Sequence, residues 1–227
     1  MNYRTLRHFR ALFFPVRCPV CRKIIGADDR FCNECYDKLT PCKENVRIKG
    51  ASGFYALFEY TPEIRPAVSL MKDGICGNAP YAFGSCLADL LVSQKADRKF
   101  SCIIPVPMHR RDMKKRGYNQ SAFIAEHIGR ILDKKVLKNT VIKNRLTVPQ
   151  KKLNRKERMK NLENAFTVID TAEIHGKSVL LVDDICTTGS TLAEVANLLT
   201  ANGAKEIYCA VCCYTTNKKR DDFYESH

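Results

Sequence analysis

The stretch SVLLVDDICTTGSTL, residues 178–192, decides the fold. Its apolar run, residues 179–182, is short and bounded, which predicts a strand buried on both faces of a parallel sheet. Asp183 and Asp184 follow at the carboxyl end of that strand, where open α/β sheets bind their ligands. A turn rich in hydroxyl side chains comes next, and the residues behind it have helical periodicity. We therefore expect a strand, an acidic pair, a ligand-binding turn and a helix.

The turn has the composition of a phosphate site. Backbone N–H groups at a helix N-terminus attract anions, and the helix dipole adds to this attraction. Gly189 permits a close approach, and hydroxyl donors come from Thr187, Thr188, Ser190 and Thr191. Two carboxylates would repel a bare phosphate, so we expect them to accept hydrogen bonds from the neutral hydroxyls of an attached ribose, with a divalent cation nearby. The alternative is a plain strand–helix turn with Ser190 as its N-cap.

The remaining chain alternates strand and helix patterns. We expect strands at residues 52–61, 101–107, 165–170 and 206–214, and helices at 62–74, 81–94, 120–132 and 190–202. Residues 109–119 are expected to be a loop, because they are too basic to pack. Gly203 is expected to end the last helix. This alternation predicts a parallel α/β sheet.

Residues 18–42 contain two C-x-x-C pairs separated by ten residues. Each pair can form a tight knuckle, and two knuckles supply the four thiolates that tetrahedral Zn²⁺ prefers. The expected ligands are Cys18, Cys21, Cys32 and Cys35, in a structural site without an open coordination position. Two redox motifs are the alternative, but neither pair has a thioredoxin-like context. Cys42 is a spare thiol that packs or replaces one ligand.

The net charge of +14 is concentrated in one quarter of the chain. Residues 105–162 hold 17 Lys and Arg against 4 Asp and Glu. This local excess favours a polyanionic ligand over a merely solvated basic face. The apolar stretch near the N-terminus is too short for a signal peptide, and no run has the ~18 apolar residues of a membrane helix. We therefore expect a cytoplasmic protein that is not inserted in a membrane, with its thiols reduced.

The motif VLLVDDICTTGSTL resembles the phosphoribosyl-pyrophosphate signature of type I phosphoribosyltransferases. With the four-cysteine segment, the run RGYNQ (residues 116–120) and the pair Arg158 and Asn161, the chain from about Cys18 to Tyr214 resembles the ComF (ComFC) competence family. This resemblance implies a type I phosphoribosyltransferase-like sheet behind a small zinc ribbon. It also implies a role in the uptake of single-stranded DNA beside a helicase-like ATPase.

The resemblance also assigns residues. Asp183 and Asp184 would bind ribose, and Thr187, Thr188, Gly189, Ser190 and Thr191 would bind the 5′-phosphate of phosphoribosyl pyrophosphate, with Mg²⁺. Residues 151–160 resemble a lid that closes over such sites, which makes Arg155 and Arg158 catalytic candidates beside the acids. Pyrophosphate or nucleic acid would be bound by His109, Arg110, Arg111, Arg116, Tyr118, Asn119, Gln120 and Lys156. The alternative for the lid is a solvated helix face.

We thus expect a zinc ribbon with an N-terminal extension at residues 1–45, a phosphoribosyltransferase-like domain at 46–217 and a tail at 218–227. The expected function is a competence factor that handles single-stranded DNA and has a pocket for a phosphorylated ribose. The alternative is an active phosphoribosyltransferase that acts on a base or another nucleophile. A regulator that senses the ligand without turnover would use the same pocket.

Overall fold

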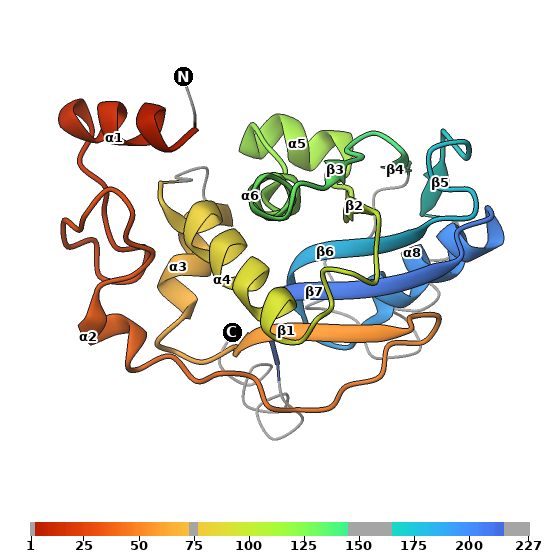
Figure 1. The fold of residues 1–227 in the computed structure, drawn as a ribbon, viewed down its shortest axis with the longest axis horizontal. Helices are drawn as coiled ribbons and strands as arrows, with labels where there is room; N and C mark the ends of the chain where they lie inside the picture. Colours follow the sequence, from red (N-terminus) through yellow and green to blue (C-terminus); the bar gives the residue numbers. More distant parts are fainter. Residues whose placement is uncertain (1–2, 73–76, 145–164, 216–227) are drawn as a thin grey trace.

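The computed structural model describes residues 3–72, 77–144 and 165–215, and a five-stranded sheet lies at its centre (Figure 1). The strands are β1 (Gly53–Glu59), β2 (Cys102–Pro105), β3 (Lys135–Val136), β6 (Ser178–Cys186) and β7 (Glu206–Tyr214), in the order β1-β7-β6-β2-β3. Every neighbouring pair is parallel. The expected parallel α/β sheet is therefore confirmed, and β6 lies at its middle.

Helices cover both faces of the sheet (Figure 1). The helices α3 (Arg65–Lys72), α4 (Ala79–Ser93) and α6 (Gln120–Leu132) share one core with Leu180 and Val182 of β6. The helix α8 (Ser190–Ala201) shares the other core with Val179 and Leu181. Alternate residues of one strand thus enter opposite layers, which explains why the whole run 179–182 is apolar.

The expected elements are found with small shifts in their bounds. Helix α3 starts at Arg65, later than the expected residue 62. Helix α8 ends beside Gly203, whose φ of 93° is left-handed, as expected for a glycine that terminates a helix. The expected strand at 165–170 is β5 (Phe166–Val168), but it lies outside the main sheet. It pairs antiparallel with β4 (Val141–Lys143), a strand that we did not expect.

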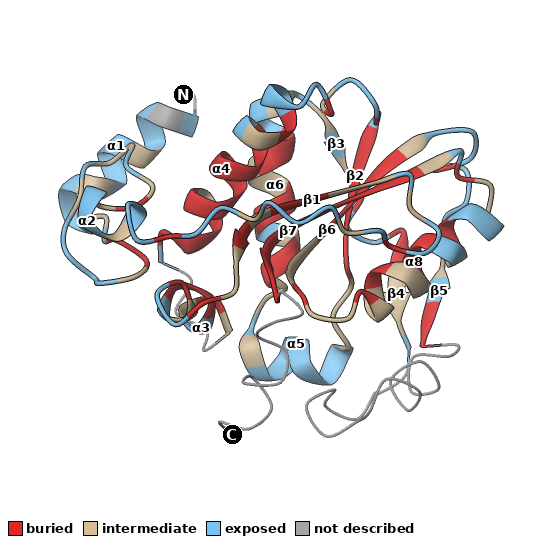
Figure 2. Cartoon of the chain, turned by 90° about the horizontal axis from the view of Figure 1, so that it is seen from below, coloured by how far each residue is buried: buried red, intermediate tan, exposed pale blue. Residues whose placement is uncertain are grey.

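Residues 110–116 correct our expectation of a basic loop, because they form the helix α5 (Arg110–Arg116). His109 caps its start, since the His109 Nδ1 accepts a hydrogen bond from the Arg111 N–H at 3.1 Å. Gly117 ends the helix with a φ of 82°, a left-handed conformation that suits glycine. No residue of α5 is buried (Figure 2). Capping at both ends, not packing, therefore defines this helix.

The four-cysteine segment, residues 18–35, lies beside α3 and α4 (Figure 1). The short helix α2 (Asn33–Tyr36) begins near the end of this segment. Phe31 of this segment packs edge-on against Phe58 of β1 and Phe83 of α4, with ring centroids 6.2 and 5.8 Å apart. All three rings are buried. The N-terminal part and the sheet therefore share one apolar core.

The connection that follows the four-cysteine segment runs along the outer edge of β1. Cys42 donates its N–H to the Leu57 carbonyl at 3.1 Å, and Glu59 donates its N–H to the Thr40 carbonyl at 2.8 Å. Pro41 and Phe58 form an antiparallel bridge between these bonds. β1 is the outermost strand and pairs with β7 on its inner side. Residues 40–42 thus cover the end of its outer side, at residues 57–59.

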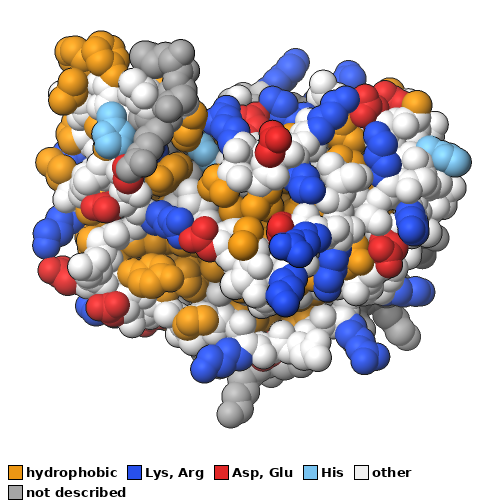
Figure 3. All heavy atoms as spheres, viewed as in Figure 1, with side chains coloured by type: hydrophobic (Ala, Val, Ile, Leu, Met, Phe, Trp, Pro, Cys, Tyr) orange, Lys and Arg blue, Asp and Glu red, His pale blue; other side chains and the backbone are white. Residues whose placement is uncertain are grey.

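The N-terminal helix α1 (Tyr3–Phe13) was not expected from the sequence. Its end carries apolar side chains that face solvent, because Leu12, Phe13 and Phe14 are 78%, 68% and 74% exposed. Figure 3 shows apolar side chains gathered at this end of the molecule. Among the described residues, no helix is both long and apolar enough to span a bilayer.

Candidate functional site

The acid pair lies at the carboxyl end of β6, as expected. The Asp183 Oδ1 accepts hydrogen bonds from the Ser121 hydroxyl and from the Asp184 N–H, both at 2.9 Å. The Asp184 Oδ1 accepts the Ile185 N–H at 2.8 Å, and its Oδ2 lies 3.9 Å from the Lys72 Nζ. Each carboxylate therefore has a donor or a cation that fixes it at the mouth of the sheet.

The turn after the acid pair leads into α8. Gly189 has a φ of 77°, and a Cβ added there would lie 2.6 Å from the Ile48 Cδ1, so both conformation and space require glycine. The hydroxyls of Thr188 and Ser190 form a hydrogen bond of 2.9 Å. Gly189 is the N-cap of α8 and has no side chain to cap it, and the Thr188 hydroxyl accepts the Ser190 N–H at 3.4 Å. This excludes the alternative in which Ser190 is the N-cap. The binding of a phosphate here stays a prediction.

A cleft of about 740 Å³ opens in front of the acid pair. It is bounded by the end of β2, the basic helix α5, the start of α6 and the end of β6. Its lining residues include Lys72, Val106, His109, Arg111, Lys115, Arg116, Asn119, Gln120, Ser121, Lys143, Asp183, Asp184 and Thr191. Five cations thus surround the two adjacent carboxylates, with Asp112 as a third acid of the lining, which suits a ligand with both hydroxyl groups and phosphates.

Eight of the 17 expected catalytic and ligand-binding residues line this cleft. Four residues of the expected phosphate-binding turn are not part of the lining, namely Thr187, Thr188, Gly189 and Ser190. Arg110 is exposed on α5 and is not part of the lining. Tyr118 is also outside the lining; its hydroxyl donates to the Met71 carbonyl, and its ring packs on Phe123 with centroids 5.2 Å apart. Of the turn at residues 187–191, Thr191 is the one residue that lines the cleft. Arg155, Lys156 and Arg158 lie outside the described residues.

Three lysines of the cleft were not predicted as site residues from the sequence: Lys115 of the basic helix α5, Lys72 and Lys143. Lys72 comes from the end of α3 and Lys143 from β4, and both are far in sequence from the acid pair. Lys72 follows the helical pattern at 62–74, and its place beside Asp184 follows only from the packing of α3. No local signal in the sequence identifies Lys72 or Lys143 as a residue of the site.

Charges in the cleft shift the protonation of its residues. Burial and, next, the neighbouring Asp184 carboxylate raise the pKa of Asp183 to about 7, against the lowering effects of the hydrogen bond from Ser121 and the charge of Lys72. Burial also lowers the pKa of Lys143, against the opposing charges of Asp112 and Asp183. Asp183 therefore changes its charge close to neutral pH.

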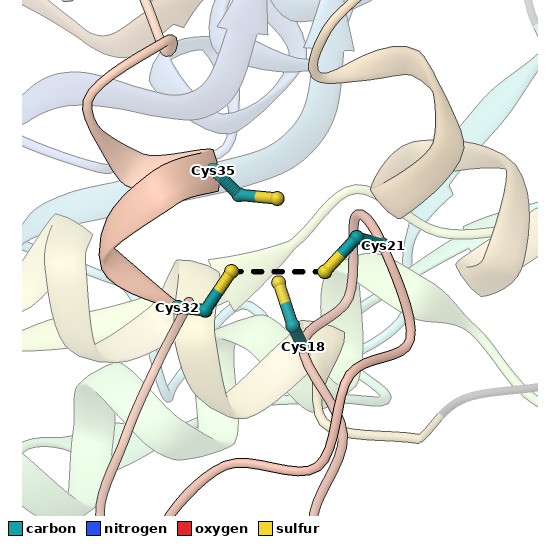
Figure 4. A group of neighbouring side chains, drawn as sticks. All are labelled: Cys18, Cys21, Cys32 and Cys35. Carbon is teal, nitrogen blue, oxygen red and sulfur yellow. Dashed lines mark hydrogen bonds between the residues drawn. The ribbon is translucent and has the colours of Figure 1, made fainter.

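A second site is formed by the four cysteines, whose Sγ atoms lie within 4.8 Å of one another. The Cys21 and Cys32 Sγ atoms are 3.6 Å apart, and all four sulfurs point to one centre (Figure 4). With Zn–S bonds of about 2.3 Å, tetrahedral zinc needs sulfurs about 3.8 Å apart, so these thiols fit the ion. Cys42 is not part of this group; it packs against the core on the α8 side of the sheet.

Two family matches agree with this architecture. Residues 118–226 match the phosphoribosyl transferase domain, and residues 9–47 match the double zinc ribbon domain. The four cysteines are therefore a zinc ribbon, and the fold is of the type I phosphoribosyltransferase kind.

Three known proteins are similar to the chain. The DNA utilization protein YhgH of Escherichia coli is 28% identical over 210 residues, which cover 87% of this chain and 90% of YhgH. Competence protein F of Haemophilus influenzae is 42% identical over 106 residues, 46% of each chain. The purine phosphoribosyltransferase of Pyrococcus horikoshii matches 59% of this chain and 83% of its own, with 18% identity and a TM-score of 0.38, too low to support an argument.

The ribbon generates a first prediction. The purified protein will contain one zinc ion per chain, and its removal by a chelator will unfold the N-terminal part, because structural zinc supplies folding free energy. Metal analysis and circular dichroism measure this. Cys42→Ser is the matched control and will keep its zinc, whereas Cys35→Ser will lose it. A metal-free protein that stays fully folded would contradict the ribbon.

The raised pKa of Asp183 generates a second prediction. A raised acid pKa means that stability is present below the unfolded value of 3.8 and is lost as pH rises through about 7. Asp183→Asn removes this loss, so its melting temperature will exceed that of the wild type by more at pH 8 than at pH 5. Each kcal/mol corresponds to roughly 2–4 °C. Thermal unfolding at both pH values measures the difference, and equal differences would exclude the assigned pKa.

Proposed function

We propose that this chain, a homologue of competence protein F and of the YhgH proteins with a phosphoribosyl transferase domain behind a zinc ribbon, handles single-stranded DNA in the cytoplasm during natural transformation. The observation that carries the proposal is the exposed basic helix α5, which borders a cleft where five cations surround an acid pair at the end of β6. A helicase-like ATPase is the proposed partner.

The proposed ligand of the cleft is phosphoribosyl pyrophosphate or a related ribose phosphate. Asp183 and Asp184 would accept hydrogen bonds from the ribose hydroxyls, and the turn at 187–191 would bind the 5′-phosphate. Arg111 and Arg116 are suited to pyrophosphate, since a guanidinium can bind two phosphate oxygens at once. Mg²⁺ bound with the ligand would reduce the charge of its phosphates. A deoxyribose inside a DNA strand has no free hydroxyl for the acids, so the DNA belongs outside this subsite.

The proposed DNA-binding surface is the outer side of α5. Arg110 and Lys114 are exposed there and do not line the cleft, and Asp112 is the only acidic residue of this helix. Successive cations can neutralise successive phosphates of a strand. Phe123, 38% exposed and close to Tyr118, offers an aromatic face near this helix. The electrostatic support is thus stronger than the support for base stacking.

The second candidate function is catalytic transfer of the phosphoribosyl group, which the match to the phosphoribosyl transferase domain supports. In that reaction the bond from C1′ to pyrophosphate breaks, pyrophosphate leaves with the electron pair, and the acceptor nucleophile bonds to C1′. Pyrophosphate release, measured with Mg²⁺ and a panel of bases, separates the two functions. Turnover with any acceptor establishes the enzyme, and binding without turnover supports a binding or sensing role.

The acid pair generates a third prediction. Asp183→Asn/Asp184→Asn will lower the affinity for phosphoribosyl pyrophosphate with Mg²⁺ by about 100-fold or more, because charged acceptors contribute about 1.5–3 kcal/mol each. Isothermal titration calorimetry measures the affinity. Asp133→Asn, an exposed acid at the end of α6, is the control and will leave the affinity unchanged. Unchanged affinity in the double variant would refute the pocket.

The basic helix generates a fourth prediction. Arg110→Ala/Lys114→Ala will weaken binding of single-stranded DNA and reduce the slope of log affinity against log salt by about 1.4, roughly 0.7 for each lost phosphate contact. Fluorescence anisotropy measures the slope. These two cations are outside the cleft lining, so the affinity for phosphoribosyl pyrophosphate will not change.

The control for this variant removes two exposed cations elsewhere. Arg98 and Lys205 lie just before β2 and β7, at the opposite end of the sheet from the cleft. Arg98→Ala/Lys205→Ala has the same net charge as the α5 variant and will keep the wild-type slope. Equal loss in both variants would indicate a nonspecific effect of net charge.

A further inference from the structure

Residues 118–121, four consecutive residues at the start of α6, contact three separate parts of the cleft wall. The Tyr118 hydroxyl and the Gln120 amide both donate to the Met71 carbonyl, the latter at 3.1 Å. The Asn119 amide donates to the Val106 carbonyl at 2.9 Å, beyond the end of β2. The Ser121 hydroxyl donates to Asp183. One short segment therefore joins α3, β2 and β6.

The two bonds to Met71 fix the end of α3. The last carbonyls of a helix have no partner within the helix, and Met71 is the penultimate residue of α3. Gln120 is only 2% exposed, so its amide also needs a partner inside the protein. Because both donors meet the same carbonyl, they hold the backbone directly before Lys72, the last residue of the helix.

Lys72 reaches from that point to the acid pair. Its Nζ lies 3.9 Å from the Asp184 Oδ2, too far for a hydrogen bond but close enough for a strong attraction in a half-buried cleft. The two neighbouring carboxylates repel each other, and Lys72 is the cation that the structure places beside Asp184. Moving the end of α3 would withdraw this charge.

We propose that residues 118–121 position the acid pair for the ribose, through Ser121 on Asp183 and through Met71 and Lys72 on Asp184. This inference rests on the proposed function, because it assumes that the acids bind the ribose. Tyr118 and Gln120 are positioning residues that act through Lys72, and Ser121 is a positioning residue that acts directly. The segment thus has a role beyond starting a helix.

The experiment is a double-mutant cycle on the affinity for phosphoribosyl pyrophosphate with Mg²⁺, measured by calorimetry. Tyr118→Phe removes one hydroxyl and keeps the ring contact with Phe123. We expect Lys72→Met, which loses a charge, to bind about tenfold more weakly than the wild type. Tyr118→Phe, which loses one hydrogen bond, will bind roughly threefold more weakly. The double variant will bind like Lys72→Met alone, and Lys72→Arg will restore most of the affinity. Additive losses in the double variant would overturn the proposal.

Ser121→Ala is the matched comparison, because it acts on Asp183 without passing through Lys72. Its loss of affinity will add to that of Lys72→Met. If Ser121→Ala causes no loss of affinity in the Lys72→Met background, Ser121 also acts through Lys72. That result would contradict the two separate contacts that we propose.

A second measurement needs no ligand and separates failure of this inference from failure of the proposed function. Carbon NMR follows the titration of the Asp183 carboxyl, which is faced by Asp184, Lys72 and Lys143 and by the buried thiols of Cys209 and Cys212. Lys72→Met and Tyr118→Phe will both move this titration to higher pH. If the shift occurs but the wild type does not bind phosphoribosyl pyrophosphate, the function fails and the positioning stands. If the ligand binds but no shift occurs, the positioning fails.

Discussion

Repulsion between two adjacent carboxylates is the constraint around which the cleft is built. Asp183 and Asp184 lie at the end of the central strand, where Asp183 loses much of its hydration. A hydroxyl from α6, backbone N–H groups and a lysine from α3 each offset part of this cost. Without these contacts the pair would take up protons and lose its value as an acceptor of hydrogen bonds. The arrangement of α3 and α6 around β6 follows from this need.

The fold was predictable wherever the signal was local. The run 179–182, buried on both faces, and the glycine-containing turn before α8 could be assigned from composition alone. The elements that were missed have little sequence signal. Helix α5 has no apolar face and depends on His109 and Gly117 at its ends, and the strands β3 and β4 are two and three residues long. The two short strands are fixed by their neighbours in space, whereas α5 is fixed by the caps at its own ends.

The site divides in the same way. The acid pair and the turn are contiguous in sequence, and so are the paired cysteines, so their grouping could be predicted from spacing. Lys72 is more than one hundred residues from Asp184, and only the packing of α3 brings the two charges together. Tyr118 shows a further limit: the sequence assigned it to pyrophosphate or nucleic acid, whereas its hydroxyl is bonded to the Met71 carbonyl. Contacts between segments that are distant in the sequence can be identified only once the fold is known.

The strip of chain at residues 40–42 has a consequence for how the two parts of the protein depend on each other. It bonds to two backbone groups on the free side of β1, the Leu57 carbonyl and the Glu59 N–H, and a strand whose edge is bare readily pairs with strands of other molecules. A truncated chain that begins after this strip would have an open sheet edge, and it would also expose Phe58 and Phe83, which pack against Phe31. Such a protein would self-associate through β1 and through the uncovered apolar core.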